Sequence, residues 1–169
     1  MFRSFRTILC ALSLVGLVAA CGSMPPPLKA TVQAWPDAIG VFEAGYRGIS
    51  EKYIEYISVE RLALDGIKGF STIDPALHVR KSENSITLSY TDQRILSVDL
   101  PKSNDVHGWA KLTSDLAIAA RAYSADMKVA DAEKIYEAVF DGVLSKLDLY
   151  SRYAGAEDAR KNRAQRDGF

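Results

Sequence analysis

The sequence has few of the residues that build disulfides and metal sites. Among its 169 residues are two cysteines and two histidines. A disulfide scaffold needs several paired cysteines, and a zinc site needs three or four ligands at short spacing. His78 and His107 have no second histidine or cysteine near them in the sequence. We therefore expect surface or cap roles for both, and predict no metal and no cofactor.

The sequence also lacks an excess of charge of one sign. It has 21 Lys+Arg and 21 Asp+Glu, a formal net charge of zero. A phosphate-binding surface needs a basic excess, and no aromatic residues that could stack on bases lie between the basic residues near the end of the chain. These basic residues are Arg160, Lys161, Arg163 and Arg166. We therefore do not expect nucleic acid as a partner.

The longest apolar run covers residues 8–20. It is shorter than the roughly 20 residues with which a helix spans a bilayer. Arg3 and Arg6 precede this run, and small residues end it. A basic start, a short apolar stretch and small residues at its end are typical of a secretory signal.

The residues Val18-Ala19-Ala20-Cys21 resemble the lipobox of bacterial lipoproteins. The resemblance implies cleavage of a signal peptide, residues 1–20, between Ala20 and Cys21, and attachment of a diacylglycerol to the Cys21 thiol. It implies a lipid bilayer as partner and a periplasm-facing place in the bacterial cell envelope, with Gly22 favouring the outer membrane. Proline-rich residues 21–36 then form an extended tether. Cys10 leaves with the signal, so the mature chain has no thiol for catalysis.

Apolar residues at helical spacing predict four helices within a domain of residues 37–153. The first begins near Asp37 as cap, and the second begins after Ser58 and ends near Phe70. The third begins after Asn104 or Asp105, and the fourth covers about residues 129–147. The apolar face of the first helix consists of Ile39, Phe42, Tyr46, Ile49, Tyr53 and Tyr56.

Alternating polar and apolar residues predict one β-hairpin at about residues 85–100, with its turn at residues 91–94. The charged tail, residues 154–169, has helical composition and few apolar residues, so we expect a frayed helix. The predicted fold is mainly α with a small β-hairpin, an α+β arrangement. Residues 60–74 also resemble residues 133–148, with one added residue needed to align the two ends.

No group of residues in the sequence predicts catalysis. Ser124 and Lys128 would lie one helical turn apart, but a nucleophile also needs a pocket and an oxyanion hole. Gly40, Gly45 and Gly48 lie within a helical pattern rather than in a phosphate-binding loop. We therefore predict no catalytic residue, and a hydrolase that uses Ser124 and Lys128 is the least favoured of the functions considered.

The C-terminal region resembles the carboxyl-terminal processing peptidases. In that family a helix ends in leucine-aspartate-proline-(histidine or tyrosine)-serine-x-tyrosine, a charged helix follows, and a phenylalanine-glycine-glycine segment opens a PDZ domain. Here residues 147–153 read Leu-Asp-Leu-Tyr-Ser-Arg-Tyr, and residues 166–169 read Arg-Asp-Gly-Phe. Leu149 takes the place of the motif's proline.

The resemblance implies a chain equivalent to the helical front section of such a serine peptidase. The family's PDZ domain would begin at Phe169, and its catalytic Ser/Lys pair would lie beyond that residue. We therefore expect no activity from this section alone, and a role in scaffolding or self-association. The alternative is a free-standing lipoprotein that binds a periplasmic protein partner.

Overall fold

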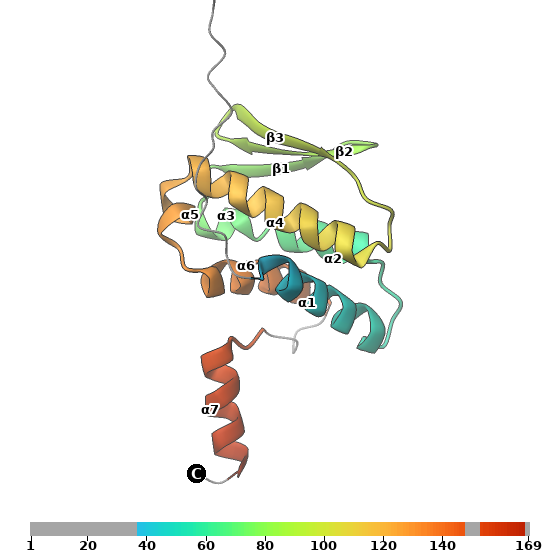
Figure 1. The fold of residues 1–169 in the computed structure, drawn as a ribbon, viewed down its shortest axis with the longest axis vertical. Helices are drawn as coiled ribbons and strands as arrows, with labels where there is room; N and C mark the ends of the chain where they lie inside the picture. Colours follow the sequence, from blue (N-terminus) through green and yellow to red (C-terminus); the bar gives the residue numbers. More distant parts are fainter. Residues whose placement is uncertain (1–36, 148–152, 168–169) are drawn as a thin grey trace, which may run out of the picture.

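The computed structural model describes residues 37–147 and 153–167 (Figure 1). The predicted signal peptide and tether, with Ala20 and Cys21, lie outside the described residues. The described helices are α1 (Ala38–Lys52), α2 (Val59–Ile67), α3 (Phe70–Ile73), α4 (Val106–Tyr123), α5 (Ala125–Val129), α6 (Ala132–Leu144) and α7 (Ala156–Asp167). The described strands are β1 (Leu77–Lys81), β2 (Ser85–Tyr90) and β3 (Gln93–Asp99).

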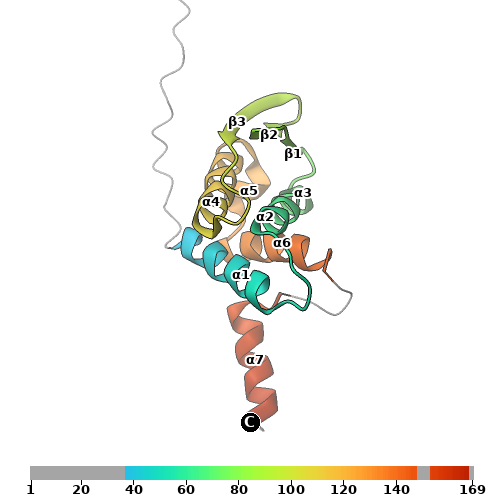
Figure 2. The same ribbon diagram turned by 90° about the vertical axis from the view of Figure 1, so that its right-hand side faces the viewer.

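The domain has three layers, which Figures 1 and 2 show from two sides. The sheet forms one outer layer and rests on α4. Helices α2 and α4 form the middle layer, and α1 and α6 form the second outer layer, where α1 packs on α4 and α6 packs on α2. Helix α7 extends from this helical side, away from the sheet. The mainly helical α+β fold predicted from the sequence is confirmed.

The sheet has three antiparallel strands in the order β1-β2-β3, so the prediction of a lone hairpin is incomplete. Strand β1 begins four residues after the end of α3 and contains only two apolar residues, Leu77 and Val79. Two alternating apolar residues are too short a pattern to predict a strand from the sequence. Strands β2 and β3 form the predicted hairpin around a turn of Thr91 and Asp92. Thr91 has a φ of 53°, a left-handed conformation that a β-branched residue rarely adopts.

Several helix ends differ from the predicted ones. Helix α1 ends at Lys52, so Tyr56 lies beyond it, and Asp37 has a left-handed φ of 68° and makes no side-chain cap. The predicted fourth helix is the shorter α6, which begins after Asp131, because the Asp131 carboxylate caps it by accepting a hydrogen bond from the Lys134 amide. The short helix α5, which precedes it, was not predicted. The predicted caps at Ser58 and Asp105 are confirmed, since each side chain accepts an amide hydrogen bond three residues on.

Helix α4 runs through the centre of the core, and eight of its side chains are buried. Trp109 is fully buried, and its indole nitrogen donates to the Lys102 carbonyl at 3.0 Å. The fully buried Tyr46 hydroxyl on α1 pairs with Thr113 Oγ1 on α4 at 2.9 Å. Among the described residues, no buried side-chain N or O atom is without a hydrogen-bond partner. The core therefore has no buried polar atom waiting for a ligand in this region.

Three glycines bring α2, and the turn that follows it, close to α6: Gly66 in α2, Gly69 in the turn and Gly142 in α6. A Cβ on Gly69 would overlap the Ala138 carbonyl oxygen, and one on Gly142 would lie 2.8 Å from the Asp65 carbonyl oxygen and 3.3 Å from Gly66 Cα. Gly69 and Gly142 each lie nine residues after the glutamate that begins their segment, Glu60 or Glu133, in the two similar segments noted in the sequence. We call Gly66, Gly69 and Gly142 together the glycine seam.

We predict that Gly69→Ala lowers the free energy of unfolding by about 2–3 kcal/mol, the upper part of the range for core overpacking, because the new methyl group meets backbone that cannot turn away. Gly48→Ala is the matched control. No atom lies within 4 Å of a Cβ at Gly48, which lies within α1, so this change should raise stability by about 1 kcal/mol through helix propensity. Urea unfolding measures both, and equal effects of the two substitutions would contradict the seam.

Candidate functional site: an apolar groove beside helix α1

An apolar groove of about 400 Å³ lies between α1 and α6. Helix α1 forms one wall, α6 the other, and the residues that precede α7 close one side. The lining residues are Val41, Ala44, Gly45, Gly48, Ile49, Lys52, Phe140, Leu144, Tyr153 and Ala154. Lys52 is the one charged residue among them, so the groove suits an apolar side chain rather than a polar substrate.

Two glycines of α1 shape this groove. A Cβ on Gly45 would overlap the Phe140 ring, so the missing side chain lets that ring lie against the α1 backbone. A Cβ on Gly48 would meet nothing within 4 Å, so the Gly48 backbone is an uncovered part of the groove surface. Glycine disfavours a helix at both positions. The contact with Phe140 explains why α1 has a glycine at residue 45, which the sequence pattern did not reveal.

The closing residue, Tyr153, is held by one ring and one hydrogen bond. Its ring stacks on Phe140, with centroids 5.1 Å apart and an angle of 20° between the rings. Its hydroxyl donates to Glu133 Oε1 at 3.1 Å. Burial, followed by the hydrogen bond to the Glu133 carboxylate, raises the pKa of Tyr153 to about 12. The stacking fixes the point at which the chain leaves the domain toward α7.

An exposed apolar side chain lies in the loop that follows α1. Ile54, two residues beyond Lys52, is 98% exposed. Its neighbour Tyr53 is half-buried and donates its hydroxyl hydrogen bond to the Leu147 carbonyl at 2.9 Å. Tyr56 is exposed and accepts a hydrogen bond from Asn104 Nδ2. The predicted tyrosine face is therefore correct for the buried Tyr46 and wrong for Tyr56, which lies on the surface.

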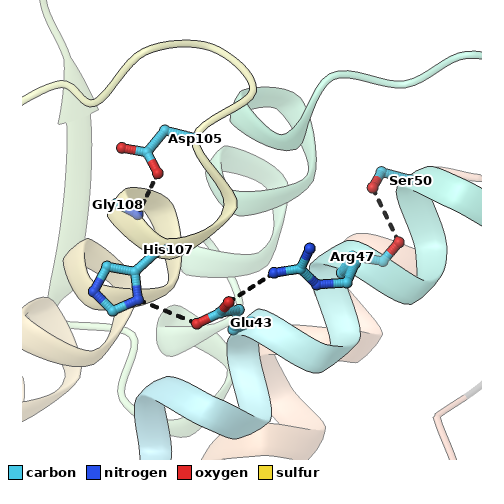
Figure 3. A network of polar contacts seen from close by, with 6 residues as sticks. All are labelled: Glu43, Arg47, Ser50, Asp105, His107 and Gly108. Atoms are coloured by element: carbon cyan, nitrogen blue, oxygen red, sulfur yellow. Dashed lines mark hydrogen bonds and ion pairs between the residues drawn. The ribbon is translucent and has the colours of Figure 1, made fainter.

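The two histidines occupy surface positions. His107, in the first turn of α4, lies 3.1 Å from Glu43 Oε2 on α1, and Arg47 pairs with the other carboxylate oxygen at 2.7 Å (Figure 3). The hydrogen bonds from His107 and then Arg47 lower the pKa of Glu43. His78 is exposed on β1. In residues 37–147 and 153–167, no three His, Cys, Asp or Glu side chains are grouped to hold a metal.

Ser124 has a structural role in this fold. It is 1% exposed, and its hydroxyl donates to Asp74 Oδ2 at 2.5 Å and accepts from the Met127 amide at 3.0 Å. The side chain therefore caps α5 and ties it to the chain that follows α3. Lys128 is exposed, and its carbonyl accepts a hydrogen bond from Arg121. The geometry provides no nucleophile with an adjacent base at this pair.

In the part of the chain that the structure describes, no helix has both the length and the apolar character needed to cross a bilayer. Comparison with protein-family models, curated proteins and solved structures finds no match to this chain. The groove, the exposed side chains and the sequence motifs are therefore the features from which a function can be inferred.

The raised pKa of Tyr153 gives a test of the groove. A phenol with a pKa near 10 when unfolded and about 12 when folded stabilises the fold fully below pH 10. This contribution is lost as the pH rises through about 12. We predict that Tyr153→Phe, which keeps the stacked ring, loses less stability than the unchanged protein between about pH 9 and pH 11.5. Urea unfolding across this range measures the difference, and parallel losses would contradict the assignment.

Proposed function

We propose that this protein is a lipid-anchored lipoprotein of the bacterial cell envelope, facing the periplasm, whose helical domain associates with a second copy of itself. The domain serves as a non-catalytic scaffold. The observation that carries the association is the apolar groove beside α1, together with Ile54 exposed in the loop after the same helix. The anchor rests on the lipobox-like residues Val18-Ala19-Ala20-Cys21.

We further propose that the chain corresponds to the helical front section of a carboxyl-terminal processing peptidase. Besides the similar residues at 147–153 and 166–169, the order of elements supports this correspondence, because α6 is followed by the charged helix α7. No catalytic residue of that family has a counterpart at any position here. If the correspondence holds, the coding sequence that follows Phe169 specifies a PDZ domain, and an unrelated gene in that place would count against it.

The association follows from the shape of the surface. In a twofold dimer the same patch meets itself, so a hollow in the patch is filled by a protrusion of the same patch on the other copy. The loop after α1 provides the protrusion in Ile54, and the groove lined by α1 and α6 provides an apolar hollow. Burying one isoleucine from each copy removes apolar area from water twice, which favours association.

The lipid anchor predicts that a bacterial host incorporates a labelled fatty acid into the full-length protein, with the protein in the membrane fraction. Cys21→Ala removes the sulfur that carries the lipid and should abolish the label and release the protein from the membrane. Cys10→Ala is the matched control, since this residue lies within the predicted signal, and it should leave labelling unchanged. Undiminished labelling of the Cys21 variant would overturn the anchor.

The association predicts a concentration-dependent dimer in sedimentation velocity of the unlipidated mature chain. Ile54→Glu should weaken the dimer at least tenfold, because it places two charges in the apolar interface. Val129→Glu is the control, since Val129 on α5 is also highly exposed, at 83%, against 98% for Ile54. A monomer at all concentrations, or equal weakening by both variants, would contradict self-association.

These experiments also distinguish self-association from the alternative function, which is binding of a periplasmic protein partner. A monomeric chain that captures one defined periplasmic protein, with capture lost in Ile54→Glu and retained in Val129→Glu, would identify the groove as a partner-docking site instead.

A further inference from the structure

Helix α7 carries a concentration of positive charge that the rest of the domain does not share. Residues 159–166 contain four Lys+Arg and no acidic residue, whereas residues 37–147 contain 13 Lys+Arg and 17 Asp+Glu. The described domain therefore has a net charge of −4. Helix α7 as a whole also contains Glu157, Asp158 and Asp167, so its net charge is +1, and its four cations are gathered at residues 160–166. The zero net charge of the whole sequence hides this separation.

Three arginines of α7 lie on one face of the helix. Arg160, Arg163 and Arg166 are spaced three residues apart, which places them within about 120° of arc and about 9 Å of axis. All three are exposed, and no ion pair joins any of them to another of the described residues. Lys161, on a different face, lies 4.0 Å from Asp158. We call Arg160, Arg163 and Arg166 the arginine stripe.

The stripe has the charge to bind phosphates and lacks the apolar residues needed to enter a membrane. Arginine pairs with phosphate oxygens through two parallel hydrogen bonds. The apolar residues in positions 158–166 are Ala159 and Ala164 alone, so nothing in this stretch would insert among acyl chains as an amphipathic helix does. Binding at this face would be electrostatic and would weaken as salt increases.

We infer that the arginine stripe rests on the anionic headgroups of the bilayer that holds the protein. The inference rests on the proposed lipid anchor, because a lipid on Cys21 keeps the chain beside a membrane surface. The 16 residues of 21–36 reach up to about 55 Å when extended, farther than the width of a domain of this size. Both the lipid and α7 can therefore meet the same bilayer.

The charge separation sets the orientation of the bound protein. An anionic surface attracts the arginine stripe and repels the domain with its net charge of −4, so the domain stands away from the headgroups while the stripe faces them. Helix α7 lies on the side of the domain opposite the sheet (Figures 1 and 2). The sheet therefore points toward the periplasm, and α7 toward the bilayer.

Vesicle binding tests the inference without the lipid. The mature chain with Cys21→Ala, unlipidated, should sediment with vesicles of phosphatidylglycerol and phosphatidylcholine at low salt. It should not sediment with phosphatidylcholine alone. Replacing the stripe with Arg160→Gln, Arg163→Gln and Arg166→Gln should weaken binding by about a hundredfold, at about fivefold for each cation lost near the surface.

A control variant removes the same charge from elsewhere. Arg80→Gln, Arg94→Gln and Lys128→Gln change three exposed cations outside α7 and should leave vesicle binding within about threefold, a small part of the effect expected for α7. Equal loss in both triple variants, or equal binding to both kinds of vesicle, would overturn the inference. Salt-sensitive self-association through the stripe without vesicles would also overturn it, in favour of the acidic domain of a second copy.

The lipidated protein supplies a second measurement. Trypsin cleavage after the stripe arginines should be slower when the protein is anchored in vesicles that contain phosphatidylglycerol than in phosphatidylcholine vesicles. Free inorganic phosphate should not reproduce this protection. If Cys21 takes no label but the unlipidated chain still binds anionic vesicles through the stripe, the anchor fails and the headgroup site stands. The reverse result would leave the anchor and remove the site.

Discussion

The backbone contact between α2 and α6 determines where most of the other elements lie. Gly66, Gly69 and Gly142 let the two helices approach until main-chain atoms touch, and this distance fixes α6 relative to the rest of the bundle. Helix α6 carries Phe140 to the flank of α1, where Gly45 receives the ring. The same contact sets the start of α3, since Gly69 precedes Phe70, and α3 leads directly to the first strand. A methyl group at the seam would therefore displace both the groove and the base of the sheet.

Two polar links connect the layers that this contact arranges. Tyr46 and Thr113 join α1 to the centre of α4 at 2.9 Å, and Ser124 and Asp74 join the start of α5 to the end of α3. Both links are buried, where an unsatisfied hydroxyl or carboxylate would be costly. Each therefore favours one arrangement of its two elements over others of similar apolar burial. Ser124, the residue most easily mistaken for a nucleophile, is part of this framework.

The sequence predicted what depends on local spacing and missed what depends on distant contacts. The caps at Ser58 and Asp105 could be read from the residue type alone, because each bonds an amide three residues away. Asp37 has the same residue type, but its backbone is left-handed and its side chain makes no capping hydrogen bond. Strand β1 needed β2 beside it to be recognised, since five residues with two apolar positions carry little pattern. The groove could not be predicted, because Gly45 and Phe140 are 95 positions apart and only the packing of α6 joins them.

Tyr153 connects the two surfaces to which function is assigned. It closes the groove through its ring and begins the segment that leads to α7, so anything that displaces it from Phe140 also frees the start of that segment. Association through the groove would bury Tyr153 further. A second copy that covers the outer face of the Tyr153 ring would keep this ring stacked on Phe140 and so hold the start of the segment in place. A helix with a firmly held start keeps its arginines in one direction relative to the domain, which three separate charges need if they are to meet a flat surface together. The groove and α7 are therefore joined through one aromatic contact, although they differ completely in chemistry.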